Sequence, residues 1–400
     1  MDLAWWQIVL GVIVGLLLLM VLVIVHEWGH AVAAIRNGVK VEEFGLGFPP
    51  RAKILGKIRI PAGKKFREVQ DKSGKTLLTL NWLLPLGGFC QMKGETDDAR
   101  EKGSYGAASF WAKTKILFAG VLMNLVAAIV IFTVLAWVGM PKIFPNQFAI
   151  NGDNRGQQGT VEIAGVVKGS PAEKAGLRKG DLITTVAGTK VQLSNEVPNL
   201  TKSNAGKEIK IEYQRDGKSR VAKPTLNKAG SAQGYLGIQT VQKDYATIKA
   251  TWSAPLVGVA STFQFIGATF AGLGDILANL FGGLWGLVTG GGAAAEAQLN
   301  KAGESVAGPV SILGVIFPSA LAAGPVTLLW IMGVISLTLT VMNILPIPGL
   351  DGGRWYLTAG FKLFKKKLTK QKEGQINGVG MMILYGLIIL ITVHDIWGMF

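Results

Sequence analysis

The chain has 400 residues, of which 49% are hydrophobic and only 16% are charged, whereas soluble domains usually carry about 25% charged residues. This composition excludes an ordinary soluble enzyme, and it also excludes intrinsic disorder, which needs low hydrophobicity and high charge. The formal net charge of +16 would suit nucleic acid, but basic residues on so apolar a chain indicate a lipid bilayer as the partner, and we expect no nucleic acid.

Four uncharged stretches are long enough to cross a bilayer, which takes about 20 apolar residues. The first is interpreted as a retained membrane helix, because it lacks a basic leading region and its apolar run is longer than that of a signal peptide; a cleaved signal peptide is the alternative. We therefore predict a polytopic α-helical membrane protein with about four transmembrane helices, a membrane-associated β-rich loop and an inserted β-rich domain. The predicted transmembrane regions are 1–35, 110–140, 325–353 and 375–400, built on Leu3–Val25, Ile116–Met140, Pro325–Leu345 and Gly374–Val393.

Flanking charges predict the orientation. Only Asp2 precedes the first span, whereas Arg36, Lys40 and further basic residues follow it. The positive-inside rule places the amino terminus outside and residues 36–109 in the cytoplasm. By the same rule the basic segment 354–374 is cytoplasmic, and residues 150–243 lie outside. We expect the chain in the cell's inner (plasma) membrane, with its active site toward the cytoplasmic leaflet.

The region 36–109 contains alternating apolar and polar residues that predict strands. Arg51–Ile60 alternates, and Leu77–Trp82 is too apolar for an ordinary loop. The glycine-rich run Pro85–Phe89 bends the chain back toward the membrane. We predict a β-rich element that re-enters the inner leaflet, where its backbone must be met by protein or water.

Residues 150–243 alternate short strands with turns. Strands are expected at Val161–Val167 and Leu182–Val186, and Asp216-Gly217 marks a hairpin turn. Ser170 and Pro171 open a short capped helix. The run GSPAEKAGLRKGDLITTVAG resembles PDZ domains of bacterial membrane proteases. That resemblance implies a peptide-binding turn that begins a strand at Tyr235, Leu236, Gly237 and Ile238, with a possible C-terminal peptide as ligand; a barrel that only spaces or shields the membrane part is the alternative.

The region 244–324 is apolar but rich in small residues. If residues 150–243 lie outside and the third span enters from outside, this region crosses the membrane either twice or not at all. Asp275 divides it, and we predict amphipathic helices that lie at the outer interface. Two re-entrant or spanning helices are the alternative.

The sequence HEWGH at the end of the first span has the form H-E-x-x-H. On a helix, His26 and His30 share one face and can bind Zn²⁺, while Glu27 can take a proton from the attacking water. Three ionisable side chains at the end of an apolar span are expensive unless they serve a site or are paired. Polar residues that simply emerge at the interface are the alternative.

A zinc site needs a third protein ligand. His394 is predicted at the opposite leaflet, because the last span runs from inside to outside. Asp351 is predicted at the same leaflet as His30, in the run NILPIPGLDGG (Asn343–Gly353). The two prolines stop regular helix, so a carboxylate on irregular backbone can turn toward a metal. A solvated aspartate in a helix-end turn is the alternative.

HExxH together with NxxPxPxLDG resembles the paired signatures of the site-2 protease family of intramembrane zinc metalloproteases. The resemblance covers nearly the whole chain and extends to Gly45–Pro49, Ala119-Gly120 and Asn124. It implies one Zn²⁺ per chain held by His26, His30 and Asp351, Glu27 as the general base, and Asn343 as a residue that holds substrate backbone. Its nearest likeness is to bacterial proteases that cleave anti-sigma factors, although many of those have two PDZ domains and this chain has room for one.

The resemblance implies a zinc-dependent metalloendopeptidase that cleaves transmembrane protein substrates, among them anti-sigma factors or signal-peptide remnants, in regulated intramembrane proteolysis. A substrate helix must unwind before attack, and an edge of the 51–92 element, at Leu77–Asn81, is expected to receive it as an added strand. The alternative is a non-enzymatic PDZ adaptor with a vestigial metal site. A soluble-type zinc protease with a membrane anchor is excluded, because the histidines adjoin the apolar span.

Overall fold

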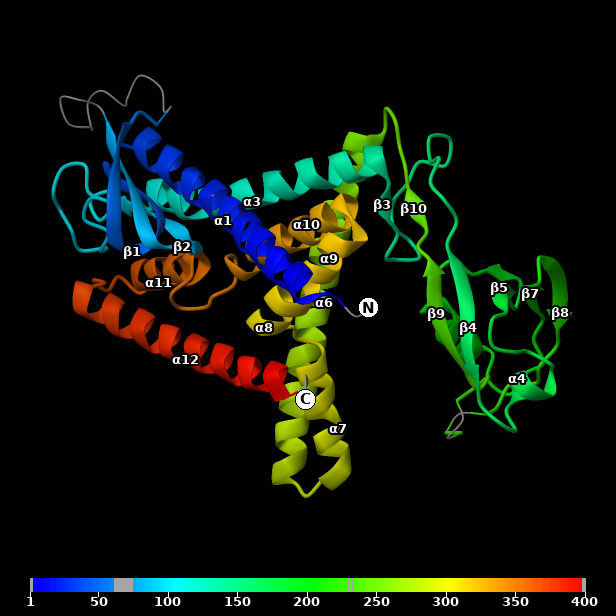
Figure 1. Cartoon of the computed structure of the whole chain (residues 1–400). Coiled ribbons are helices and arrows are strands. Elements are labelled where there is room, and N and C mark those ends of the chain that lie inside the picture. The colour runs from blue at the N-terminus through cyan, green and yellow to red at the C-terminus, as the bar shows by residue number, and fades with distance from the viewer. Residues whose placement is uncertain (1–2, 61–74, 229, 232–233, 398–400) are drawn as a thin grey trace. The chain divides into compact units, whose positions relative to one another are not determined.

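The computed structural model describes residues 3–60, 75–228, 230–231 and 234–397, and the chain forms two compact units (Figure 1). The helical unit comprises Met1–Ile131 and Thr262–Phe400, and the β unit comprises Phe132–Ser261. The division agrees with a β-rich insertion between membrane segments, because the β unit lies between two parts of the chain that pack together.

Five helices of the described residues are long and apolar enough to cross a membrane. Four of them cover most of the stretches predicted as spans, so those stretches are confirmed as helical. The fifth lies in the region predicted as interfacial. They are α1 (Trp5–Arg36), α3 (Phe110–Val138), α6 (Ala254–Val288), α10 (Pro325–Met342) and α12 (Lys370–Trp397).

The prediction that Asp275 divides two helices is wrong, because α6 continues through it as one helix. A single exposed aspartate inside a helix costs only a fraction of a kcal/mol, so it does not stop the helix as proline would. After α6, the helix α7 (Gly292–Glu304) folds back, and Gly283 and Gly286 leave room for Leu299 and Ala295. Whether this region crosses the membrane twice or not at all stays a prediction.

A continuous helical run leads into α10 and packs against α1. It consists of α8 (Pro309–Ser311), a π-helical turn η1 (Ile312–Ile316) and α9 (Phe317–Ala323). Gly15 of α1 admits the ring of Phe317, since a β-carbon there would lie 2.6 Å from the ring. Near the C-terminal end of α12, Asp395 accepts hydrogen bonds from the amides of Gly308 and Ser311, which connects α12 to the same run.

The region 36–109 forms a small sheet from β1 (Val41–Ile58) and β2 (Thr76–Met92). Each strand bends back on itself and contributes two paired segments, 43–46 and 51–58 from β1 and 76–81 and 88–92 from β2. Across the sheet these segments lie in the order 51–58, 76–81, 43–46, 88–92. Thr79 is paired with Ile54 on one side and with Gly45 on the other. The prediction that Leu77–Asn81 offers a free edge to a substrate is therefore wrong: this segment is central, and the described edges are 51–58 and 88–92.

The β unit contains a sheet in the order β8-β7-β5-β4-β9, with β6 paired to β5. Strands β4 and β5, the β7–β8 hairpin and the short helix α4 confirm the predicted pattern, and Ser170 caps α4 by accepting from the Glu173 amide. The strand expected to begin within Tyr235–Ile238 is present as β9, which begins at Ile238, the last residue of that run. The elements are β3 (Met140–Pro141), β4 (Thr160–Val166), α4 (Pro171–Lys174), β5 (Leu182–Val186), β6 (Thr189–Lys190), α5 (Glu196–Ser203), β7 (Ile211–Arg215), β8 (Lys218–Ala222), β9 (Ile238–Asp244) and β10 (Thr247–Ile248).

Candidate metal centre

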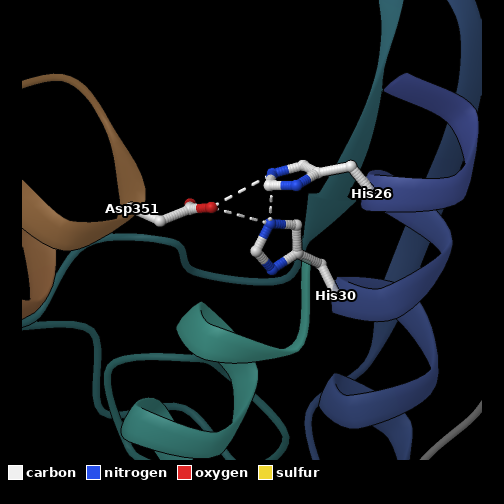
Figure 2. Close-up of side chains that lie close together, drawn as sticks. All are labelled: His26, His30 and Asp351. Carbon is white, nitrogen blue, oxygen red and sulfur yellow. Dashed lines mark hydrogen bonds and ion pairs between the residues drawn. The ribbon is translucent and has the colours of Figure 1, made fainter. Parts of the chain in front are cut away.

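His26 and His30 lie one turn apart on α1 and point the same way (Figure 2). Their Nε2 atoms are 3.1 Å apart, and the rings meet edge to face. His30 is buried, with 5% of its surface exposed, and His26 is partly buried. The i, i+4 spacing thus brings two potential ligand atoms together on one helix face, as the sequence predicts.

Asp351 reaches the two histidines from a separate element. It is the first residue of α11 (Asp351–Leu363), which follows a turn in which Gly349 has a φ of +94°. The prediction of an irregular backbone at Asp351 is therefore wrong; the irregular backbone ends just before it, because a carboxylate is favoured in the first turn of a helix. The amide of Gly352 donates to the carbonyl of Asn343 at 2.8 Å and fixes this helix start.

The three side chains converge on one point (Figure 2). Oδ2 of Asp351 lies 3.1 Å from Nε2 of His26 and 3.1 Å from Nε2 of His30. With the 3.1 Å between the two histidines, the three atoms form a nearly equilateral triangle. A tetrahedral zinc ion with bonds of about 2.0–2.2 Å holds neighbouring ligand atoms roughly 3.3–3.6 Å apart. The triangle is therefore close to the size that zinc requires.

The hydrogen bond of His30 leaves the correct nitrogen free. Its Nδ1 lies 2.8 Å from the carbonyl oxygen of Ile116, and a carbonyl only accepts, so Nδ1 carries the proton. In the neutral ring Nε2 then has a bare lone pair that faces Oδ2 of Asp351, a buried oxygen without a hydrogen-bond donor. Lone pairs that face one another without a proton between them are satisfied by a cation, so the donor set fits zinc.

Asn124 of α3 fixes the orientation of the His26 ring. Its side-chain nitrogen is placed 3.2 Å from Nδ1 of His26, while its Oδ1 is buried without a partner. The two ends of an amide are assigned from their hydrogen bonds, and turning this amide over gives Oδ1 a donor, Nδ1–H of His26. Nε2 of His26 is then free for a metal, as in His30.

Gly120 allows α3 to pass beside both imidazoles. A β-carbon at this position would lie 2.7 Å from Cε1 and 2.8 Å from Nε2 of His26, and it would also collide with His30. Gly29 of α1 is equally close to α3, since a β-carbon at this position would lie 2.5 Å from the carbonyl oxygen of Ala119. Small residues thus bring α1 and α3 into contact at the level of the cluster.

Glu27 lies between the two histidines in the sequence and is partly buried. The backbone amide of Cys90, in the edge segment 88–92 of the sheet, is directed toward the Glu27 carboxylate. Burial, followed by the neighbouring Glu27 charge, raises the pKa of the Cys90 thiol well above its usual range. The thiol is therefore neutral and does not compete for a metal.

The sequence matches the family described as Peptidase family M50 over residues 14–387. The chain belongs to this family. With the His26, His30 and Asp351 cluster in place, this M50 chain is a zinc-dependent metalloprotease with apolar helices suited to a membrane. The predicted resemblance to site-2 proteases and the predicted zinc cofactor are confirmed.

Named relatives agree with the family. A Clostridium perfringens chain named "Putative zinc metalloprotease CPE1693" is 31% identical over 96% of this M50 chain and 98% of its own length. The zinc metalloprotease RasP of Shouchella clausii is 24% identical over 95% of this chain and 97% of its own. A solved PDZ domain of the SdrC-like protein Lmo2051 from Listeria monocytogenes is 31% identical and covers 20% of this chain and 86% of its own, with a TM-score of 0.18.

The remaining predicted site residues are not members of the His26, His30 and Asp351 cluster. Asn343 caps α10, and its side-chain amide donates to the carbonyl of Leu339 at 3.0 Å. Leu236 and Gly237 are buried in the β unit, and their carbonyls accept from the amides of Ala172 and Val167. Their substrate-binding roles stay predictions.

Sequence reasoning noted Asn124 and Gly120 only as family matches and missed what they contact. The signal for Asn124 was a lone amide inside an apolar span, which is costly unless it has a partner. Gly120 carried no comparable signal, since glycine is common in membrane helices.

Proposed function

We propose that this M50 protease hydrolyses peptide bonds within or near transmembrane segments of other membrane proteins. The observation that carries the proposal is the place of the cluster. Two of its three donors and Glu27 belong to α1, a helix apolar enough to cross a membrane, and Asp351 follows a second such helix, α10. A peptidase site built on such helices is suited to substrates in the bilayer.

Different residues of the chain hold the metal, position the imidazoles and act as the general base. His26, His30 and Asp351 would hold one zinc ion, while Ile116 and Asn124 keep the imidazoles in the tautomers that leave Nε2 free. The chemistry that zinc supplies at such a site is polarisation of a carbonyl and acidification of a water. Glu27 acts as the general base for the attacking water and later returns the proton to the leaving amine.

The substrate is presented as an added strand at the edge segment 88–92. A transmembrane helix hides its carbonyls in hydrogen bonds, so it must unwind and find new partners in a medium without water. This segment pairs with β1 on one side only among the described strands, and its Cys90 amide is directed toward Glu27. An unwound substrate on this edge would therefore lie beside the general base.

The β unit acts as a filter on the outer side of the membrane. Strand β9 lies at the end of the strand order, so among the described strands one of its edges has no partner and can take an added strand. The turn Tyr235–Ile238 leads directly into it, as the resemblance to PDZ domains implies. In this proposal the turn receives the C-terminus of a substrate already trimmed outside, the amino terminus of the chain lies outside, and the metal centre faces the cytoplasmic leaflet.

The test is cleavage of one transmembrane test substrate by the purified full chain in lipid. The wild type should release two fragments, and Glu27→Gln should release none while binding the same amount of zinc. Equal cleavage by both proteins would contradict the proposed base. If neither protein cleaves and both still capture a C-terminal peptide, the chain is the adaptor of the alternative hypothesis.

A further inference from the structure

A basic pocket lies outside the metal centre, where four segments of the helical unit meet. It holds about 300 Å³, at the lower end of the range for small-molecule sites. Its basic side chains are Arg100, Lys113, Lys362, Lys366 and Lys367. They face one carboxylate, Asp97, which is already paired with Lys113. The pocket therefore carries a clear excess of positive charge.

The pocket lies at the height where two apolar helices begin. Phe110 and Lys113 belong to the first turn of α3, and Lys366 and Lys367 come just before α12, which begins at Lys370. Both helices are long and apolar enough to cross a membrane. With α3 and α12 as the spans predicted from the sequence, the segment between α11 and α12 lies at the level of the lipid headgroups.

Exposed apolar side chains stand close in the sequence to residues that line the pocket. Trp111 is 69% exposed, Leu363 is 77% exposed and Phe364 is 73% exposed. Tryptophan and other aromatic residues gather at headgroup level in membrane proteins. Phe361 and Leu368 line the pocket itself, so its basic wall is joined to an apolar one.

Apart from Lys113, the basic groups of the pocket are in none of the ion pairs found among the described residues. Lys362 stands 4.0 Å above the ring of Phe110, which fixes its position without neutralising its charge. Arg100 donates through Nη1 to the carbonyl of Gly106 at 3.2 Å and retains its other guanidinium donors. Lys366 and Lys367 are exposed, and the ion pairs found among the described residues do not include them.

We infer that this pocket binds the phosphate of an anionic phospholipid headgroup. The amine and guanidinium groups donate to the phosphate oxygens, and the apolar wall of Phe361 and Leu368 receives the glycerol end of the acyl chains. The inference is independent of the proteolytic activity, because none of the pocket residues belongs to the metal centre. The same donors could take free phosphate, so the experiment separates the two sources.

The experiment measures binding of phosphatidylglycerol to the full chain in detergent micelles, with phosphatidylcholine and inorganic phosphate as parallel probes. Lys366→Gln combined with Lys367→Gln removes two charges from the pocket. Lys365→Gln combined with Lys372→Gln removes two exposed charges of the same segment that do not line it. A lysine that donates directly to the bound phosphate contributes about fivefold in affinity, the usual worth of one hydrogen bond, whereas a lysine of the same segment that does not reach the phosphate contributes little. The first pair should weaken phosphatidylglycerol binding about 30-fold, and the control pair should weaken it less than about threefold.

The inference is supported if the wild type and the control pair bind phosphatidylglycerol more tightly than phosphatidylcholine and the Lys366→Gln, Lys367→Gln pair loses this preference. Equal weakening in both pairs would overturn it, because the charges would then act as an unstructured basic surface. Inorganic phosphate that displaces phosphatidylglycerol at equal concentration would overturn the lipid as the source. Zinc content, measured in each variant, serves as the control for folding, since the ligands lie elsewhere.

Discussion

The side-chain amide of Asn124 on α3 lies 3.2 Å from Nδ1 of His26 on α1. The same α3 residue accepts, through its backbone carbonyl, the hydroxyl proton of Ser336 on α10 at 2.8 Å. One residue thus connects the helix that carries the histidines with the helix that leads to Asp351. Since an outer partner fixes which imidazole nitrogen is free, Asn124 is a positioning residue of the metal centre.

Asn124→Ala is expected to weaken zinc binding by about 10- to 100-fold, the usual effect of losing the outer partner of a metal-binding histidine. Asn124→Asp, which keeps an acceptor for Nδ1–H, should restore most of it. Zinc affinity measured by competition with a chelator checks the expectation. Thr338→Ala, which removes an exposed hydroxyl bonded within α10, is the control. Unchanged affinity in Asn124→Ala would contradict the positioning role.

The ligand set is tested by single substitutions in the purified full chain. His26→Ala, His30→Ala and Asp351→Ala should each weaken zinc binding by more than about 100-fold, because a ligand matters more than its outer partner. Glu27→Gln should retain one zinc per chain and lose cleavage. The readouts are metal analysis and cleavage in parallel. Full zinc in the Asp351 variant would remove that residue from the ligand set.

The ligands of the metal centre were predictable because they belong to two short motifs whose chemistry is explicit. HEWGH places two imidazoles on one helix face by spacing alone, and NILPIPGLDGG offers a carboxylate at the end of a predicted span. The partner of His26 was not predictable from spacing. It depends on the contact between α1 and α3, which Gly29 and Gly120 permit and which no local pattern states.

The fold was predictable where periodicity is local and unpredictable where pairing is distant. The helices of the four spans and the strands of the β unit follow the apolar pattern. The double pairing of Thr79 does not, because β1 and β2 each fold over and bring a third segment alongside. The predicted break at Asp275 was wrong for a different reason. One charge changes the hydropathy of a segment strongly, but it changes the helix propensity only slightly.

Asp153 of the β unit provides a pH-dependent contribution to stability. Hydrogen bonds from the hydroxyls of Ser253 and Thr251 hold the pKa of this carboxyl well below its usual range. A lowered pKa stabilises the fold above the unfolded value of about 3.9, and this contribution is lost as the pH falls below it. The Tm difference between wild type and Asp153→Asn should be constant from about pH 5 to 8 and shrink below about pH 4. A difference that grows in acid would contradict this assignment.

The proposed orientation is tested by labelling single cysteines in a Cys90→Ser background. Positions 57, 202 and 365 are exposed lysines in β1, α5 and the segment after α11. A membrane-impermeant thiol reagent should label position 202 from outside, and positions 57 and 365 only after the membrane is opened. The reason is the excess of basic residues around the latter two. Labelling of position 365 from outside would place Asp351 and the histidines on opposite sides and contradict the orientation.

The substrate edge is tested by removing single backbone donors with proline. The Cys90 amide is directed toward Glu27 and so points away from β1, and alternate amides of a strand point the same way. The amide of Gly88 therefore faces the free side, where an unwound substrate would pair. Gly88→Pro should lower cleavage about five- to tenfold, the worth of one hydrogen bond, with zinc content unchanged.

Thr79→Pro should instead damage the fold, because Thr79 is paired on both sides. A helix-breaking glycine in the substrate should partly restore cleavage by Gly88→Pro, since it lowers the cost of unwinding. Wild-type cleavage by a folded, zinc-loaded Gly88→Pro protein would rule out strand addition at this edge.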